Sequence, residues 1–250
     1  AKCVGACCCA AGGSWNQAAP IAAGVEVFMT ALDLLDDVED EEGSEIRDRL
    51  GPARFLNAST GLLCLGLKTL ANVENGAQAV DILLTLALAS CAGQDADLSL
   101  RSDGAVDLEG ALEITQRKSA SLAAAACRLG AFCAGASKTT QERYERFGAC
   151  LGITAQLAND LAALGPGARG KTDTTLRRPT LPLVHAAQLA SRPSSHRGNT
   201  YNEHEAYRRG PAQLTWAVAE MFRRQAIELI PQLTNDPAGQ ADLASLPPVI

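Results

Sequence analysis

The feature that most constrains the fold of this chain is the abundance of alanine and leucine in long runs, with no segment in which polar and β-branched residues alternate. Half-buried strands need that alternation, whereas apolar residues spaced three and four apart favour amphipathic helices. The chain is therefore predicted to be all-α. Helices are expected over residues 1–11, 18–41, 52–73, 77–99, 106–135, 139–164, 180–191 and 203–234.

Size and charge narrow the class further. The chain has 250 residues, of which 47% are hydrophobic, and no linker or internal repeat divides it, so residues 1–250 are predicted to form a single domain. A net charge of −6 without a basic stripe argues against a nucleic-acid partner. The best apolar run, ILLTLALASCAG, is too short to cross a bilayer, so no membrane span is expected.

The nine cysteines are odd in number, and several lie inside apolar helical runs. That pattern predicts reduced, mostly buried thiols in a cytoplasmic protein rather than a disulfide scaffold. The cluster of Cys3, Cys7, Cys8 and Cys9 is followed by no second ligand pair at zinc spacing, so helix packing is favoured over a metal site. This first helix is expected to continue a segment that precedes residue 1.

A cluster of aspartates lies at the carboxyl end of one of the predicted apolar helices, in the stretch VFMTALDLLDDVED. Helical spacing places Asp33, Asp36, Asp37 and Asp40 on one face. Clustered carboxylates repel one another, and burial raises their free energy further, so a compensating cation is expected. Mg²⁺ suits such an oxygen-rich site, because it binds through one or two carboxylates and substrate phosphates. A solvated acidic helix end is the alternative interpretation.

A second polar group lies later in the chain. The helix LGITAQLAND carries Gln156, Asn159 and Asp160 out of an apolar run. The loop that follows it, GPGARGKTDTTLRRPTLP, is basic, with Lys171, Arg177 and Arg178. Acidic groups on two helices and basic groups in a nearby loop are what is needed to hold a diphosphate through metal ions and cationic side chains.

Together these motifs resemble the trans-isoprenyl diphosphate synthase family, also called the polyprenyl synthetase family. DDVED at 36–40 is similar to the family's DDxxD signature, and GQDADL, with Gln94 and Asp97, is similar to its GQ-x-x-DL motif. RKSASLAAAACRLGAFCAG, with Lys118 and Ser119, resembles the helix that contains Lys-Thr. LGITAQLANDLAALG and GKTDTTLRRPTLP resemble the second aspartate motif and the loop that follows it, so the likeness covers essentially the whole chain.

The resemblance implies a bundle of long, mostly antiparallel helices around a deep central cavity, and a homodimer. It also implies a Mg²⁺-dependent prenyltransferase of isoprenoid biosynthesis, in which about three Mg²⁺ ions help an allylic diphosphate to ionise. The double bond of isopentenyl diphosphate then attacks the cation head to tail, which gives an all-trans isoprenyl diphosphate. The long apolar helices around 106–135 are candidates for the dimer interface, although periodicity does not distinguish an interface from core.

The resemblance also assigns roles to individual residues. Catalytic roles fall on Asp36, Asp37, Asp40, Lys118 and Lys171. Metal ligation falls on Asp36, Asp40, Asn159 and Asp160. Substrate binding falls on Phe28 and Ala31, which would line the cavity floor, and on Arg47, Arg49, Gln94, Gln156 and Arg178.

The chain departs from the family pattern at three places. The second motif reads Asn159-Asp160-Leu-Ala-Ala and has lost two of its three acids, which should weaken the metal site there. Asp48 separates Arg47 from Arg49 and would oppose a bound diphosphate. The family's Gly-Lys-Arg segment would lie upstream of residue 1.

These departures leave other functions open. The same fold could transfer the prenyl group to a peptide side chain or another acceptor, as occurs in bacterial relatives with a degenerate second motif. A catalytically weak subunit that regulates a complete synthase is a further alternative. Terpene cyclisation is disfavoured, because cyclases usually use an aromatic-rich cavity and only 4% of this chain is aromatic.

Overall fold

The structure is a computed structural model that describes residues 1–40, 44–103, 106–164, 180–190, 200–248 and 250. The side chains of 101–103, 190 and 200–208 are not among those described. Every regular element in the described part is a helix, so the all-α prediction is confirmed. The elements are α1 (Lys2–Ala10), α2 (Trp15–Glu39), α3 (Glu45–Leu50), α4 (Pro52–Ala71), α5 (Gly76–Asp103), α6 (Leu108–Thr115), η1 (Gln116–Ala120), α7 (Ser121–Cys133), α8 (Lys138–Ala163), α9 (Leu181–Ala190), α10 (Thr200–Leu233) and α11 (Pro237–Ala244).

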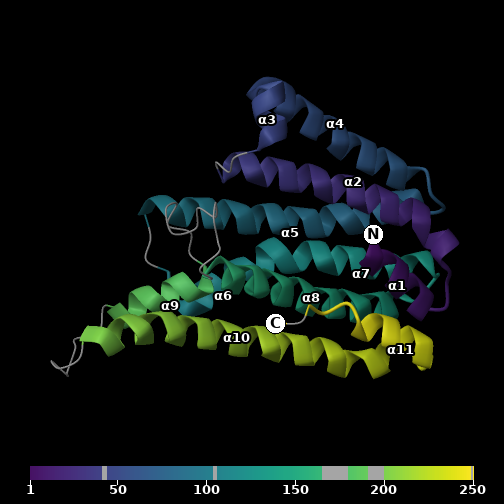
Figure 1. Cartoon of the computed structure of the whole chain (residues 1–250). Helices are drawn as coiled ribbons and strands as arrows, with labels where there is room; N and C mark the ends of the chain where they lie inside the picture. Colours follow the sequence, from purple (N-terminus) through teal and green to yellow (C-terminus); the bar gives the residue numbers. More distant parts are fainter. Residues whose placement is uncertain (41–43, 104–105, 165–179, 191–199, 249) are drawn as a thin grey trace.

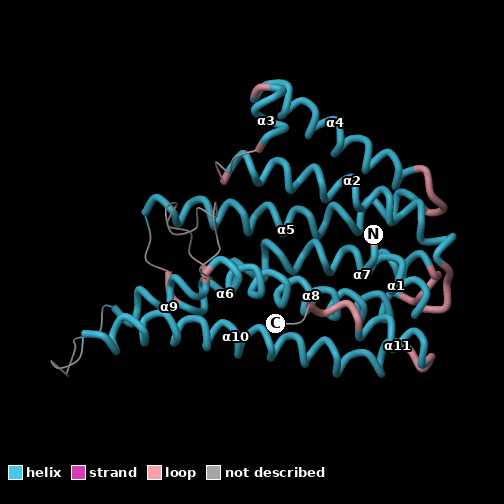
Figure 2. The backbone as a smooth tube through the Cα atoms, viewed as in Figure 1, coloured by secondary structure: helices cyan, strands magenta, loops and turns pink. Residues whose placement is uncertain are grey.

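The long helices lie side by side, and successive ones run in opposite directions (Figure 1). Helices α3 and α4 cover one side of the bundle, and α10 and α11 cover the opposite side (Figure 1). The carboxyl ends of α2, α5 and α8 and the start of α6 gather at one end of the molecule, whereas most of the described loops lie at the other (Figure 2). This arrangement brings the two aspartate motifs to the same end of the bundle.

Capping residues and prolines explain where several helices begin, and a glycine explains where one of them ends. Ser14 caps α2, since its side chain accepts a hydrogen bond from the Gln17 amide, and Asp107 caps α6 in the same way at Gly110. Two short helices were not predicted. Ser44 starts α3, and Gly51, at φ 77°, ends it just before Pro52 begins α4. Asp236 and the adjacent proline start α11.

The segment predicted as one helix over 106–135 is interrupted by η1, a single turn of π-helix with the sequence QRKSA. A π-turn adds one residue to a helix, and such turns are often found at functional sites. The interruption lies opposite α5, and Lys118 is its central residue. The helix on either side continues as α6 and α7.

Helix α7 lies at the centre of the bundle, where it packs against α1, α5 and α8. Small residues allow these close approaches: a Cβ on Gly130 of α7 would lie 2.5 Å from the Val4 carbonyl oxygen of α1. A Cβ on Gly148 of α8 would lie 2.5 Å from the Ala123 carbonyl oxygen of α7. Because α7 is enclosed on these sides, its apolar face is core, and the proposed dimer interface over 106–135 is not supported there.

The cysteines follow the prediction only in part. All nine are free, and Cys7, Cys8 and Cys127 are buried where α1 meets α7. Cys64 and Cys91 are exposed instead, because they lie on the outer faces of α4 and α5. No three Cys, His, Asp or Glu side chains among the described residues are grouped as a preformed metal site.

Two helices, α2 and residues Gly76–Leu100 of α5, are long and apolar enough to cross a bilayer by length and composition alone. Buried core helices of soluble bundles share these properties. Helix α2 packs against α4, α1 and α7, and α5 packs against α7, η1 and α4. Both helices therefore pack within the bundle, where 39% of each apolar window is buried.

Candidate active site

A lysine from η1 lies among three carboxylates. The Lys118 ammonium is 2.9 Å from Oδ1 of Asp36, 3.9 Å from Oδ2 of Asp40 and 3.9 Å from Oδ2 of Asp97. Asp36 and Asp40 come from the end of α2, whereas Asp97 comes from α5. Only 2% of the Asp40 side chain and 10% of the Asp97 side chain are exposed, so this charge cluster is largely enclosed by protein. Lys118 supplies the compensating cation that the acidic helix requires.

The four aspartates on α2 do not act as one group. Burial raises the pKa of Asp36; Lys118 opposes that shift and the neighbouring Asp40 adds to it. Desolvation also raises the pKa of Asp33, but its acidic neighbours are Asp37 and Glu26 rather than the Lys118 cluster. Helical spacing predicted one face for all four carboxylates, but their contacts differ: Asp36 and Asp40 contact Lys118, whereas Asp33 neighbours Asp37 and Glu26.

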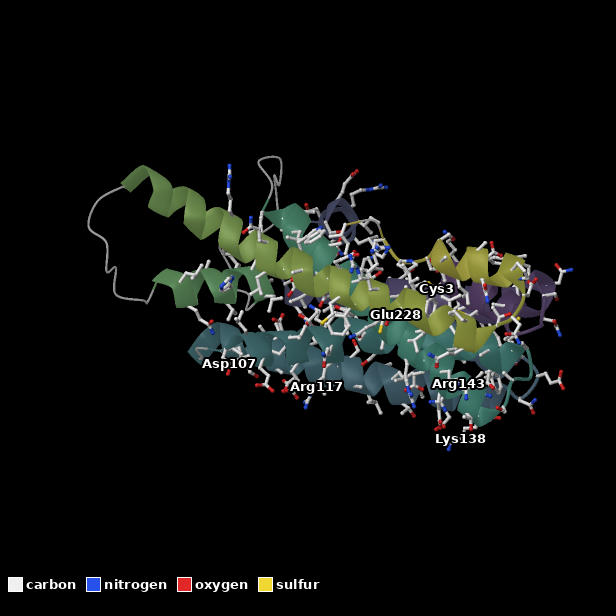
Figure 3. The ribbon with its side chains drawn as sticks, turned by 90° about the horizontal axis from the view of Figure 1, so that it is seen from below. Cys3, Asp107, Arg117, Lys138, Arg143 and Glu228 are labelled. Carbon is white, nitrogen blue, oxygen red and sulfur yellow. The ribbon has the colours of Figure 1, made fainter. Side chains whose placement is uncertain are left out.

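The backbone of Lys118 is fixed by α5. The Ser90 hydroxyl donates a 2.6 Å hydrogen bond to the Lys118 carbonyl oxygen. Gly93 permits the close approach, since a Cβ there would lie 2.5 Å from the Lys118 backbone nitrogen. The adjacent Arg117 points outward, where it pairs with Glu113 at the edge of the molecule (Figure 3). The π-turn therefore directs one basic side chain into the carboxylate cluster and its neighbour into solvent.

A second contact joins α2 and α5. The Gln94 amide on α5 donates a 2.8 Å hydrogen bond to Oε2 of Glu39 on α2. Within the part of the chain that the structure describes, the side-chain carbonyl oxygen of Gln94 is buried without a hydrogen-bond partner. Buried amide oxygens are normally satisfied, so this atom is a candidate acceptor for a ligand or its water.

The second motif is joined to η1 by a chain of hydrogen bonds. The Ser119 hydroxyl donates to Oε1 of Gln156 at 3.0 Å, and the Gln156 amide donates to Oδ1 of Asp160 at 2.9 Å. This chain fixes the amide orientation of Gln156 and holds the buried Asp160 carboxylate. Asn159, predicted as a metal ligand, is exposed at the preceding position of α8.

The remaining predicted site residues are more scattered. Arg47 donates a 3.5 Å hydrogen bond to the Asp37 carbonyl oxygen, and Arg49 is exposed. Phe28 and Ala31 are buried, with Phe28 in the apolar core shared by α2 and α4. Lys171 and Arg178 lie outside the described residues. Sequence reasoning assigned no role to Asp97 or Ser119, although both lie inside the quoted motifs.

The side chains at the end of α2 fit a hard divalent cation. Asp36 and Asp40 are one helical turn apart and share one basic neighbour, Lys118, so their carboxylate oxygens face the same space. The Asp36 and Asp40 carboxylates repel each other when both are ionised, which favours a divalent cation beside them. The second motif offers Asp160 with amide neighbours, a weaker donor set.

Comparison with known proteins decides the family. Residues 2–214 match the profile of the polyprenyl synthetase family. The chain belongs to this family. It is 30% identical over 188 residues to the tryptophan prenyltransferase ComQ of Bacillus spizizenii, a match that covers 75% of this chain and 65% of that relative's length. It is 27% identical over 254 residues to the geranylgeranyl diphosphate synthase of Mycobacterium tuberculosis H37Rv, covering 96% of this chain and 72% of the synthase.

Solved structures support the fold of this polyprenyl synthetase family member. The polyprenyl synthase of Caulobacter crescentus CB15, solved with calcium and isoprenyl diphosphate, superimposes with a TM-score of 0.84. The superposition covers 98% of this chain and 81% of that one at 24% identity. The helical bundle expected from the sequence motifs is therefore the family fold.

Proposed function

We propose that this chain is a Mg²⁺-dependent prenyltransferase that ionises an allylic isoprenyl diphosphate and adds isopentenyl diphosphate head to tail, giving an all-trans isoprenyl diphosphate. The observation that carries the proposal is the Lys118 cluster, in which Asp36, Asp40 and Asp97 meet one lysine at the end of the bundle where the second motif also lies. Membership of the polyprenyl synthetase family supports it.

The residues present would form two metal-binding sites, one at each aspartate motif. Asp36 and Asp40 would hold Mg²⁺, with Asp37 supporting them, and Asp160 with Asn159 would form a weaker second site. Bound Mg²⁺ would neutralise the diphosphate and make it a better leaving group. Lys118, whose ammonium lies beside Asp36 and Asp40, can donate hydrogen bonds to the same diphosphate. Burial of Asp40 and Asp97 limits water around the leaving group, which strengthens each of these charge interactions.

The other predicted residues are assigned by motif. Arg47 and Arg49 would bind isopentenyl diphosphate, while Gln94 and Gln156 would orient the allylic substrate. Lys171 and Arg178 would contact the allylic diphosphate, and Phe28 and Ala31 would limit the length of the product. We also propose a cytoplasmic homodimer, with exposed leucines on α4 and α5 at the interface: Leu56, Leu65, Leu84 and Leu88.

A tryptophan side chain is a second candidate acceptor. The ComQ relative is named a tryptophan prenyltransferase, and its match is 30% identical. The degenerate second motif and the acidic residue between Arg47 and Arg49 both point to altered handling of isopentenyl diphosphate. On this alternative, the Lys118 cluster would perform the same ionisation, and only the nucleophile would differ.

Product analysis separates the two acceptors. The protein is incubated with Mg²⁺, isopentenyl diphosphate and, in separate reactions, the allylic C5, C10 and C15 diphosphates. An elongated all-trans diphosphate establishes the synthase and its product length. Prenyl alcohol with unconsumed isopentenyl diphosphate indicates another acceptor, and a tryptophan-containing peptide is then added and analysed for a prenyl mass increase. Absence of both products and of allylic diphosphate turnover contradicts the proposal.

A further inference from the structure

The ammonium group of Lys118 lies against the carboxylate oxygens that a divalent cation would use. It is 2.9 Å from Oδ1 of Asp36 and 3.9 Å from Oδ2 of Asp40. Mg²⁺ binds carboxylate oxygens at about 2.0–2.1 Å and requires near-octahedral geometry. A cation that bound Asp36 and Asp40 would therefore lie within a few ångströms of the Lys118 ammonium, and the two like charges would repel each other.

Only the side chain of Lys118 can respond easily to that repulsion. Its backbone carbonyl accepts the Ser90 hydrogen bond, and its backbone nitrogen packs against Gly93. The lysine side chain carries a compact charge on a flexible four-carbon stem, so its ammonium can move several ångströms while the π-turn stays in place. The backbone anchors limit where the charge can go.

Asp97 offers the displaced ammonium a nearby partner. Its Oδ2 is already 3.9 Å from the ammonium, and it lies on α5, the helix that also anchors the Lys118 backbone. It is not part of the α2 pair, so a cation at Asp36 and Asp40 would not remove this contact from Lys118. Its buried position keeps the ammonium beside the site instead of letting it move into solvent.

We propose that Lys118 is a counter-ion of the first aspartate motif in the metal-free protein, and that a divalent cation binding at Asp36 and Asp40 displaces its ammonium onto Asp97. The inference rests on the proposed function, since it assumes that Asp36 and Asp40 hold the metal. Asp97 is then a positioning residue that acts through Lys118. In this exchange the metal ion competes with the Lys118 ammonium for the same carboxylates. The displaced ammonium stays beside the bound diphosphate.

Calorimetric titration with Mg²⁺ alone, without diphosphate, tests the competition. Lys118→Met keeps most of the side-chain volume and removes the charge, so it should bind Mg²⁺ roughly tenfold more tightly than the unaltered protein. The control Lys68→Met makes the same charge change at an exposed position on α4 and should leave the affinity unchanged. Lys118→Gln provides a second neutral variant, and circular dichroism establishes that each protein is folded.

A double-mutant cycle tests the role of Asp97. Asp97→Asn should weaken Mg²⁺ binding, because the ammonium then has only the α2 carboxylates of the cluster to pair with. In a Lys118→Met background the same substitution should have much less effect, since no ammonium remains to be held. An equal loss in both backgrounds would mean that Asp97 acts on the metal directly, and it would overturn the positioning role.

The outcomes separate this inference from the proposed function. If the unaltered protein binds Mg²⁺ and both neutral variants at Lys118 bind it no more tightly, the exchange is wrong while the metal site stands. If none of these folded proteins binds Mg²⁺, alone or with an allylic diphosphate, both the exchange and the proposed metal site fail.

Discussion

At the scale of single residues, the carboxyl group of Asp36 is strongly affected by its surroundings in the folded protein. Burial raises the pKa of its carboxyl group, and the adjacent Asp40 adds to that shift. Lys118 opposes both effects through a 2.9 Å ion pair. The ionised form of Asp36 is therefore disfavoured in the folded protein in spite of Lys118, and carboxyl groups perturbed in this way cluster at functional sites.

Replacing Asp36 should separate function from folding. We expect Asp36→Ala to lower turnover at least about 100-fold, as loss of a transition-state charge contact does elsewhere. The melting temperature should stay close to that of the unaltered protein, because relief of repulsion with Asp40 offsets loss of the Lys118 ion pair. Steady-state kinetics and a thermal melt measure the two quantities.

The control for that change is Asp33→Ala on the same helix. Asp33 is exposed and is not part of the Lys118 cluster, so its replacement should retain most activity. The activity of Asp160→Ala should lie between those of Asp33→Ala and Asp36→Ala, since the second motif has already lost two of its three acids. Equal losses at Asp33 and Asp36 would show that total charge on α2, rather than the placement of Asp36, determines activity.

The cysteines give a second prediction at the residue scale. Burial raises the pKa of Cys8 to about 11, so its thiolate fraction at pH 8 is on the order of one in a thousand, and it should alkylate slowly. Cys64 and Cys91 are exposed and should react first. Iodoacetamide labelling followed by peptide mass spectrometry measures the order. Rapid labelling of Cys8 in the folded protein would contradict the packing of α1 against α7.

At the scale of elements, the contact between α5 and η1 links stability to the site. Gly93→Ala would place a Cβ 2.5 Å from the Lys118 backbone nitrogen and 2.8 Å from the Arg117 carbonyl carbon. Backbone atoms cannot rotate away, so η1 must shift, and overpacking of this kind typically destabilises by about 1–3 kcal/mol. We expect this loss in chemical denaturation, together with weaker Mg²⁺ binding, because Lys118 moves with η1.

Gly61→Ala is the matched control: it is the same substitution, but it should raise stability instead of lowering it. Gly61 is helical, in α4, and no neighbouring atom lies within 4 Å of the position that an alanine Cβ would take, so alanine should stabilise α4 by about 0.5–1 kcal/mol. Mg²⁺ binding should not change. A Gly93→Ala protein as stable as the Gly61→Ala protein would show that the α5 and η1 backbones are farther apart than the structure places them.

The elements were predictable to the extent that their signals are local. Apolar periodicity and breaks located the long helices, because these depend on residues a few positions apart. The six-residue α3 is too short to show a period, and α11 was missed although Asp236-Pro237 is a helix-start signal. The π-turn at Lys118 has no such signal. It depends on α5, whose contact with η1 is a tertiary interaction.

The site was predictable through its motifs rather than through its geometry. Asp36, Asp40 and Lys118 were named by resemblance, and the structure brings them together. The contact of Lys118 with Asp97 depends on how α5 and η1 pack, which spacing along one helix cannot reveal. The separation of Asp33 from Asp36 likewise depends on which face of α2 meets the bundle.

At the scale of the whole molecule, α7 is shared between two apolar clusters. Leu129 packs with residues of α1, α2 and α5, while Cys127 packs with Tyr144 and Phe147 of α8. A core that passes through one central helix gives no natural plane of division, which supports the proposal of a single domain. The same central position makes α4 and α5 better candidates than α7 for an external interface.

Exposed leucines on α4 and α5 predict the surface of the homodimer. Leu88 is 70% exposed and Leu65 is 51% exposed, with Leu84 one turn from Leu88. Stable interfaces bury about 1,200–2,000 Å², and charges enclosed there without partners are strongly unfavourable. Light scattering after size exclusion should therefore give a dimer for the unaltered protein and a monomer for Leu84→Glu combined with Leu88→Glu. Met221→Glu, at an exposed position on α10, should remain dimeric. A dimer that survives both changes at α5 would place the interface elsewhere, and a monomeric unaltered protein would exclude the dimer itself.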